Sequence, residues 1–283
     1  MAPLVLDGKR PAREIETQVA ARVAALTPRL GGRPPALAII LAGADPTSTR
    51  HGQLKESACR RVGMEPLLIC LPERTTTAEV LAEIERLNGD SRVHGVFLQH
   101  PVPRHVDERR CFDGIAPGKD VGGDATLSFG RLVVGESGFA AATPAGIMRL
   151  LSHYGVTVAG KEAVVVGRSP MVGKPMAIML LGGHATVTIC HSRTRGLPEV
   201  VRRGEIVVAA VGKPRFVKGD WLRDGAVVID AGYHRGGAGD VELAAAAGRC
   251  SAYTPVPGGV GPMTLAMLLE QTVAAAERSA GGA

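Results

Sequence analysis

The segment "VVVGRSPMVGKP" (164–175) joins an apolar run to a glycine and then to the start of a helical pattern. A glycine at the end of a strand lets the backbone approach a pyrophosphate, and the first turn of the next helix offers free N–H groups. The spacing is not G-x-G-x-x-G, because Ser169 stands where the second glycine would be and Gly173 follows Gly167 by six residues. The segment therefore favours a dinucleotide site, with an ordinary strand-to-helix turn as the alternative.

The next apolar run ends in "TICHSRT" (188–194), where a dinucleotide-binding sheet would hold the adenosine ribose. An acidic residue here favours a free 2′-hydroxyl, whereas an arginine accepts a 2′-phosphate. No acid is present, and Ser192 and Arg193 can both donate hydrogen bonds, with Arg168 directed at the same region. The pattern favours NADP over NAD, unless His191 and Arg193 are only solvated loop residues.

Apolar strand patterns alternate with helical patterns along the chain, which predicts an α/β protein with parallel sheets covered on both faces. The expected strands are 36–43, 66–71, 93–99, 162–167, 185–190, 205–211 and 225–232. The expected helices are 11–29, 47–63, 77–88, 144–154, 171–181 and 263–277. The glycine-rich stretch 104–140 is predicted to be irregular, and 278–283 to be a frayed tail.

Composition narrows the class of protein. The 283 residues suffice for about two domains. The 33 Lys and Arg against 27 Asp and Glu give a net charge of +6 spread along the chain, and aromatics are only 3%, which argues against nucleic-acid binding. The five cysteines form no C-x-x-C pair, so reduced thiols in a cytoplasm are expected rather than zinc or disulfides. No apolar run reaches about 18 residues, so no membrane segment is expected.

Two further segments suggest chemistry. The first, "PTSTRHGQLKESACRRVG" (46–63), predicts a helix with His51 and Lys55 one turn apart on the same face, and a lysine near an aromatic ring is a candidate acid/base group. The second, "TPVPGGVGPMT" (254–264), has three prolines and three glycines before the last helix. Such a density of restricted residues predicts a rigid loop whose exposed amides clamp a ligand.

Together these segments resemble the bifunctional methylenetetrahydrofolate dehydrogenase/methenyltetrahydrofolate cyclohydrolase family. The matching motifs follow the family's order and span nearly the whole chain. They are "DGK" (7–9), "DPTS" (45–48), Lys55, "GVFLQHPVP" (95–103), "KDV" (119–121), "TPAGI" (143–147), "VVVGRSPMVGKPM" (164–176), "CHSRT" (190–194), "AVGKP" (210–214), "VVIDAG" (227–232) and "TPVPGGVGPMT" (254–264).

The resemblance implies two domains with a cleft between them. Residues 1–140 would form the catalytic, folate-binding domain and 141–262 the NADP-binding Rossmann domain, with the helix in 263–283 packing back onto the first. The family removes hydride from 5,10-methylenetetrahydrofolate onto NADP, and water then opens the methenyl cation to 10-formyltetrahydrofolate. Its members are usually homodimers. The implied partner is therefore a small folate-like molecule, with no nucleic acid, membrane or metal.

The family's key lysine matches Lys55, and its partner glutamine matches Gln99. A buried lysine beside a cationic substrate has a depressed pKa and can act as both acid and base. The resemblance places substrate contacts at His51, Leu98, His100, Asp120, Gly122, Asp124, Pro257, Gly258, Gly259, Val260, Gly261 and Pro262. It places cofactor contacts at Gly167, Arg168, Ser169, Val172, Gly173, His191, Ser192, Arg193, Gly212, Tyr233 and Thr264.

Three positions in the expected folate pocket depart from the family pattern. His51 stands where the family has a tyrosine that packs on the folate, and His100 stands where leucine is usual. The family reads K-D-V-D-G, and its second aspartate bonds the pterin's amino edge, whereas "KDVGGD" places Gly122 there. Losing that contact would lower pterin affinity by about tenfold or more. Asp124 is the candidate to replace it.

Three functions stay open at this point. The chain is a working dehydrogenase/cyclohydrolase, a paralogue that has lost one step or binds another substrate, or a non-catalytic NADP- or folate-binding regulator. The presence of Lys55, Gln99 and the 257–264 loop argues against the regulator. A metal held by His51, His100 and Asp124 is disfavoured, because no pattern of residues that would orient such ligands is visible.

Overall fold

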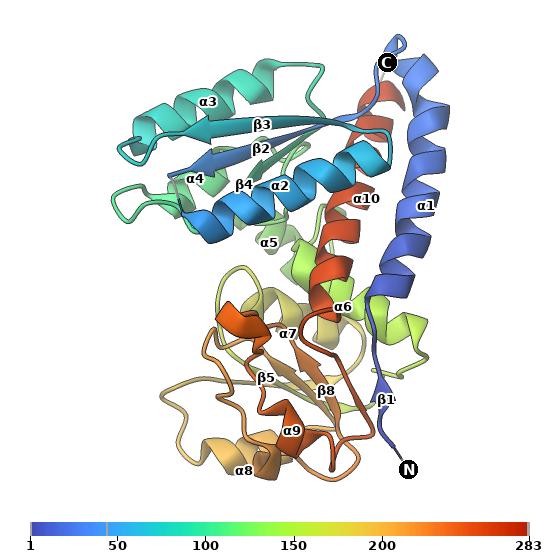
Figure 1. The fold of residues 1–283 in the computed structure, drawn as a ribbon, viewed down its shortest axis with the longest axis vertical. Coiled ribbons are helices and arrows are strands. Elements are labelled where there is room, and N and C mark those ends of the chain that lie inside the picture. The colour runs from blue at the N-terminus through green and yellow to red at the C-terminus, as the bar shows by residue number, and fades with distance from the viewer. Residues whose placement is uncertain (1, 44, 282–283) are drawn as a thin grey trace. The chain divides into compact units, whose positions relative to one another are not determined.

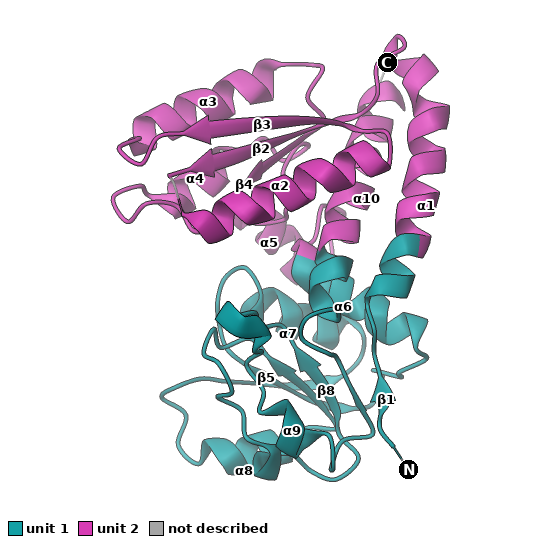
Figure 2. Cartoon of the chain, viewed as in Figure 1, with its two compact units in different colours: residues 1–13, 143–264 teal, residues 14–142, 265–283 magenta. Residues whose placement is uncertain are grey.

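The computed structural model describes residues 2–43 and 45–281, and it divides the chain into two compact units (Figure 2). Unit 1 combines residues 1–13 with 143–264, and unit 2 combines 14–142 with 265–283. Each unit contains one parallel sheet. The prediction of a two-domain α/β fold with parallel sheets is confirmed.

Unit 1 is built on a six-stranded parallel sheet in the order β1-β9-β8-β7-β5-β6, of which Figure 1 labels β1, β5 and β8. The strands are β1 (Leu4–Val5), β5 (Glu162–Val166), β6 (Thr186–Cys190), β7 (Ile206–Ala209), β8 (Val227–Asp230) and β9 (Ala252–Tyr253). The helices are α6 (Ala142–His153), α7 (Gly173–Gly182), α8 (Leu197–Arg202) and α9 (Leu243–Ala246), with short 3-10 turns η2 (Gly219–Trp221) and η3 (Arg235–Gly237). Because β5 pairs with β6 on one side and β7 on the other, the strand order reverses at β5. Ligands bind at the carboxyl ends of strands at such a point.

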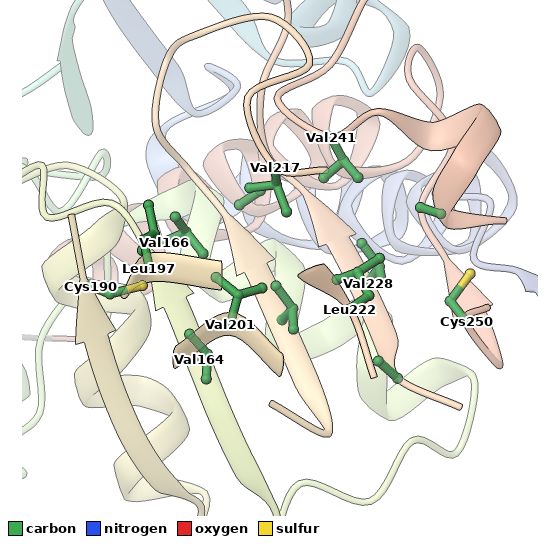
Figure 3. Close-up of a cluster of buried hydrophobic side chains, with 14 residues drawn as sticks. Val164, Val166, Cys190, Leu197, Val201, Val217, Leu222, Val228, Val241 and Cys250 are labelled. Carbon is green, nitrogen blue, oxygen red and sulfur yellow. The ribbon is translucent and has the colours of Figure 1, made fainter. Parts of the chain in front are cut away.

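The core of unit 1 explains why these short runs become strands. Figure 3 shows Val164 of β5, Val201 of α8 and Val228 of β8 within one buried apolar cluster, and each is at most 1% exposed. Such strands are nearly continuous runs of β-branched residues because both faces of a parallel sheet are covered. This packing makes β5 a rigid support for the turn that follows it.

Unit 2 has a three-stranded parallel sheet in the order β3-β2-β4. Its strands are β2 (Ala36–Ala42), β3 (Glu65–Leu71) and β4 (Gly95–Leu98), and every residue of the central β2 is buried. Its helices are α1 (Lys9–Leu26), which begins in unit 1, α2 (Pro46–Arg61), α3 (Thr77–Gly89), α4 (Glu108–Gly114), α5 (Thr126–Val134) and most of α10 (Val260–Gly281), with the 3-10 turn η1 (Thr27–Leu30). Asp45 caps α2 by accepting a hydrogen bond from the Ser48 amide at 2.7 Å.

The C-terminal helix α10 returns to unit 2, as predicted. Gln271 Nε2 donates to the carbonyls of Val121 and Ala140, at 2.9 and 3.1 Å. Arg22 of α1 forms a bidentate ion pair with Glu277, at 2.9 and 2.7 Å. The Gln271 bonds tie α10 to the segment that contains residues 120–124, and the ion pair ties it to α1.

Several short elements differ from the sequence prediction. The stretch 104–140 is not wholly irregular, because it contains α4 and α5, of 7 and 9 residues. Helices this short show too little periodicity to stand out among glycines. Helix α8 and the two-residue strands β1 and β9 were also not predicted. Residues 278–281 continue α10 rather than fraying, and 282–283 of the expected tail lie outside the described residues. Within the described part of the chain, no helix has the length and apolar character needed to cross a membrane.

Candidate active site

Lys55 and Gln99 form the centre of the site in unit 2. Lys55 is on α2, and Gln99 follows the end of β4. Lys55 Nζ donates to Gln99 Oε1 at 2.7 Å, and Gln99 Nε2 donates to the His100 carbonyl at 2.6 Å. The second bond orients the amide so that its oxygen faces the lysine. Gln99 is only 6% exposed, so this geometry is held by the surrounding packing.

A phenylalanine completes the environment of the lysine. Lys55 Nζ lies 4.7 Å from the centroid of the Phe97 ring. Burial lowers the pKa of Lys55 to about 8, against the opposing effect of the Asp124 charge. The amine therefore reaches its neutral, basic form far more readily than a solvated lysine does. Phe97 was not among the predicted site residues, although its place two residues before Gln99 on a strand could have indicated it.

The two histidines near this centre differ in their electrostatics. His51 lies one turn before Lys55, and burial, followed by the charge of Lys55, lowers the pKa of its imidazole. His100 Nδ1 lies 2.7 Å from Glu108 Oε1, and this hydrogen bond raises the pKa of His100. His51 thus favours the neutral form and His100 the charged one. Among the residues that the structure describes, no group of three or more His, Cys, Asp or Glu side chains could hold a metal ion.

Two of the residues predicted to contact the substrate have buried side chains in unit 2. Asp120 is 1% exposed, and its carboxylate accepts hydrogen bonds from Ser128 Oγ at 2.5 Å and from the Ala125 and Asp124 amides at 3.0 and 3.2 Å. Leu98, also 1% exposed, pairs with Ile40 inside the sheet. The oxygens of Asp120 are already used, so this carboxylate supports the turn that follows it.

The turn after β5 in unit 1 is held by close approaches between backbone segments that leave no room for a Cβ. Gly167 has φ +130°, and a Cβ there would lie 2.1 Å from the Ala210 carbonyl oxygen. A Cβ on Gly173 would lie 2.5 Å from the Gly167 oxygen. Ser169 Oγ accepts hydrogen bonds from the Val172 and Gly173 amides at 3.2 Å each, which leaves its own proton free to donate to a phosphate oxygen.

The tip of β6 carries no acid and is held as a tight turn. The His191 amide donates to Thr194 Oγ1 at 2.9 Å, and the Arg193 amide donates to His191 Nδ1 at 3.2 Å. Ser192 and Arg193 are both exposed. Hydroxyl and guanidinium donors without a carboxylate fit a 2′-phosphate. These residues, together with Arg168 and the turn at Gly167, therefore fit NADP.

A buried carboxylate that sequence reasoning missed holds the loop after β7. Asp240 is fully buried and accepts hydrogen bonds from the Val211 and Gly212 amides, at 2.6 and 2.9 Å, and lies 2.7 Å from His234 Nε2. Gly212 has φ +67° and open space where a Cβ would lie. Nothing in the local sequence distinguishes this aspartate from a solvated one.

Of the other predicted cofactor residues, Tyr233 is 52% exposed, and Thr264 Oγ1 forms a hydrogen bond with Thr143 Oγ1 at 3.1 Å.

The proline- and glycine-rich loop belongs to unit 1 and packs on the "DGK" segment. The Gly8 amide donates to the Gly258 carbonyl at 2.9 Å, and a Cβ on Gly8 would lie 1.9 Å from the Gly259 oxygen. Val260, at the start of α10, is 6% exposed. The predicted substrate residues at 257–262 therefore sit in unit 1, whereas Lys55 and Gln99 sit in unit 2.

The fold and these sites define a class: a two-domain α/β protein with a nicotinamide-dinucleotide site and a separate lysine acid/base centre. Residues 6–122 match the family model for the tetrahydrofolate dehydrogenase/cyclohydrolase catalytic domain, and residues 141–280 match that for its NAD(P)-binding domain. The chain belongs to the tetrahydrofolate dehydrogenase/cyclohydrolase family. The resemblance predicted from the motifs is confirmed.

Individual relatives cover the chain from end to end. It is 60% identical to the bifunctional protein FolD of Acidobacterium capsulatum, over 99% of this chain and 100% of the relative. The crystal structure of the bifunctional enzyme FolD from Campylobacter jejuni matches with a TM-score of 0.94 at 38% identity, covering 98% and 99% of the two chains. The Trypanosoma brucei FolD structure, complexed with NADP and an inhibitor, matches with a TM-score of 0.93 at 34% identity, covering 99% of each chain.

Proposed function

We propose that this chain is an NADP-dependent methylenetetrahydrofolate dehydrogenase and methenyltetrahydrofolate cyclohydrolase. It oxidises 5,10-methylenetetrahydrofolate to the methenyl form and hydrolyses that to 10-formyltetrahydrofolate. The observation that carries the proposal is the hydrogen bond between Lys55 and Gln99, in a chain 60% identical over its length to a bifunctional FolD. A paralogue with one step lost, or a regulator without catalysis, has no comparable support.

The protein residues act in three ways in this proposal. Ser169 and the turn at Gly167 hold the pyrophosphate, and Ser192 and Arg193 hold the 2′-phosphate. NADP, when bound, accepts hydride from the bridging methylene. Neutral Lys55 then takes a proton from the water that attacks the methenyl carbon and returns it to the ring nitrogen as the ring opens, while the proton of the new hydroxyl leaves to solvent as the formyl C=O forms. Gln99 orients the amine throughout, because its own amide is fixed by the His100 carbonyl.

The direct test mixes purified protein with 5,10-methylenetetrahydrofolate and NADP and follows NADPH and the methenyl product by absorbance. Turnover of both steps is expected. Oxidation without hydrolysis, or hydrolysis without oxidation, would support the paralogue that has lost one step. Absence of both at saturating folate would overturn the proposal.

The cyclohydrolase rate is expected to rise with pH through an apparent pKa of about 8. Lys55 reaches its neutral form as the pH passes the lowered pKa of its amine, and only that form can accept the proton of water. The measurement is kcat for methenyl hydrolysis between pH 6 and about 9, corrected for the rate without enzyme. A rate that is level or falling across this window would contradict the role of Lys55 as a base.

Arg193→Ala is expected to weaken NADP selectively. Loss of a charge-assisted bond to the 2′-phosphate should raise the KM for NADP by roughly tenfold to a hundredfold and leave that for NAD nearly unchanged. Arg195→Ala is the matched control, since Arg195 is another exposed arginine two residues along the same loop. Equal weakening of NADP and NAD would remove the argument for a 2′-phosphate site.

We also infer a cytoplasmic homodimer. All five cysteines are free thiols, as suits a reducing compartment. Strand β6 is an edge of its sheet, and Ile189 on it is 44% exposed, which leaves an apolar edge suited to a second copy. Light scattering should give twice the 29.4 kDa mass of the chain.

A further inference from the structure

Asp124 of unit 2 has a carboxyl group to which no described residue donates a hydrogen bond. The residue is partly exposed. Its backbone is anchored, since the amide donates to Asp120 Oδ1 at 3.2 Å and the carbonyl accepts from Arg109 Nη2. Within residues 2–43 and 45–281, no group donates a hydrogen bond to the carboxyl oxygens themselves. Because Asp124 is partly exposed and its oxygens accept no hydrogen bond from these residues, a ligand can reach the carboxyl group and supply donors.

The turn that presents Asp124 is fixed by hydrogen bonds to Asp120 and by the backbone of Gly123. Asp120 accepts bonds from the Asp124 and Ala125 amides and from Ser128 Oγ, which fixes the chain on both sides of the turn. Gly123 has φ +68°, and a Cβ there would lie 2.3 Å from the Ala140 carbonyl carbon. Only glycine fits at that position. Asp120 is thus the supporting acid, and Asp124 the acid that the turn directs.

The carboxyl group occupies space that Gly122 leaves open. A Cβ on residue 122 would lie 2.7 Å from Asp124 Oδ2 and 3.1 Å from Phe97 Cδ2. The same Phe97 ring carries the Lys55 amine 4.7 Å from its centroid. Asp124 also acts on Lys55 electrostatically, because its charge opposes the loss of the lysine's proton. Acid, lysine and aromatic ring therefore line one small region.

We propose that Asp124 is a specificity-determining residue that binds the substrate's ring edge, in the place that a side chain at position 122 would otherwise occupy. The inference rests on the proposed function, whose substrate has a pterin ring with a lactam N–H beside an exocyclic amine. Two parallel N–H donors match the two oxygens of one carboxylate. The acid lies two residues beyond position 122 along the chain, and its carboxyl group lies beside Gly122 and Phe97.

The surrounding charges agree with a group that loses its proton when such a ligand arrives. Burial, and then the charge of Asp120, raise the pKa of Asp124 to about 8. Arg109 and His100 oppose this rise, and Glu108 adds to it. Lys55 is faced by His51 and Cys59 on its own helix and by Asp124. Hydrogen bonds from the ring edge would favour the ionised carboxylate and so hold Asp124 in the form that recognises the substrate.

The first test is Asp124→Asn, which keeps the size of the side chain but replaces one acceptor oxygen by a donor. We expect the KM for 5,10-methylenetetrahydrofolate to rise by about tenfold or more, with kcat changed less, and with the KM for NADP and the melting temperature unchanged. The pH at which the hydrolysis rate rises should also be lower than in the parent, because the charge of Asp124 no longer stabilises protonated Lys55. Asp113→Asn is the control, a carboxylate that bonds Thr126 at the start of α5.

The second test exchanges the two positions. Gly122→Asp alone should bind folate no better than the parent, because its Cβ meets the Asp124 carboxyl and places two acids together. Gly122→Asp combined with Asp124→Ala removes this conflict and should recover most of the affinity that Asp124→Ala loses. If the double variant binds folate no better than Asp124→Ala, the inference is overturned. An unchanged KM for folate in Asp124→Asn would overturn it as well.

Direct titration with tetrahydrofolate separates this inference from the proposed function. If the parent binds folate, Asp124→Asn binds it weakly, and neither turns over, the inference holds and the proposed function fails. If the parent turns over folate and Asp124→Asn binds folate as well as the parent does, the proposed function holds and the inference fails. A parent that neither binds nor turns over folate would overturn both.

Discussion

Lys55→Met is expected to reduce the cyclohydrolase rate by a factor of about 10² to 10⁴, the range that positioned acid/base groups contribute. Methionine keeps most of the length and the apolar stem of the lysine but can neither donate nor accept a proton. The Phe97 ring loses the amine 4.7 Å from its centroid and keeps an apolar side chain beside it. The measurement is kcat for methenyl hydrolysis, with oxidation assayed separately. Hydrolysis within tenfold of the parent rate would contradict the role of Lys55.

The same substitution should not destabilise the fold, which separates loss of chemistry from loss of structure. Lowering the pKa of a lysine from 10.5 to about 8 means that burying its charged form costs roughly 3 kcal/mol at neutral pH. Methionine removes this cost and leaves Gln99 Oε1 without its donor, which costs about 1 kcal/mol. A net gain in the free energy of unfolding is expected below pH 8. The gain should shrink toward pH 10.5, where the unfolded lysine of the parent also loses its proton. Equal stability of parent and variant at pH 7 would mean that Lys55 is better solvated than the structure indicates.

The framework of both units could be predicted because their strands are long and strongly apolar. The run at β2 has seven consecutive buried residues, and such a run has few alternatives to a covered parallel strand. Shorter elements were not predicted, because tertiary contacts rather than sequence periodicity determine them. Helix α8 has six residues and forms against the buried cluster through Val201 and Leu197, whereas β9 has only two residues and depends on its neighbours β8 and β1.

The site was only partly predictable, for a reason that the acids at 120 and 124 illustrate. Both lie in one five-residue segment, and composition gives no ground to prefer either as a ligand. Their roles diverge because Asp120 meets three donors, whereas Gly123 turns Asp124 toward Gly122 and Phe97. Ser128 supplies one of the donors to Asp120, and the Ala140 backbone restricts the turn at Gly123. Local sequence therefore identifies the candidates, and long-range packing assigns their roles.

In unit 1, too, long-range packing rather than local sequence assigns the roles of the buried acids. Asp230 ends β8, and its oxygens accept bonds from the amides of Gly232, Asp240 and Val241, at 2.8 to 2.9 Å. Asp240 in turn holds the Val211 and Gly212 amides. Two carboxylates thus order the loops after β7 and β8, at the carboxyl ends of the strands where the cofactor is proposed to bind. They support the loops through hydrogen bonds to loop amides.

Gly167→Ala is expected to be strongly disruptive, because it combines backbone strain with a collision in unit 1. An L-residue at φ +130° is strained by about 1–3 kcal/mol. The added Cβ would also lie 2.1 Å from the Ala210 oxygen, so the ends of β5 and β7 must move apart, at a further cost of about 1–3 kcal/mol. Loss of NADP binding should accompany the loss of stability, because the turn that cradles the pyrophosphate is displaced.

Gly160→Ala is the matched control for this prediction. Gly160 also has a positive φ, +75°, and lies in the same unit, but no atom lies within 4 Å of its Cβ position. It therefore carries the backbone strain without the collision, at about 1 kcal/mol, and should leave NADP affinity unchanged. Urea denaturation and NADP titration of the two variants measure the difference. If both lose equal stability and both still bind NADP, the close approach of Gly167 to Ala210 is not what requires glycine after β5, and positive φ alone explains it.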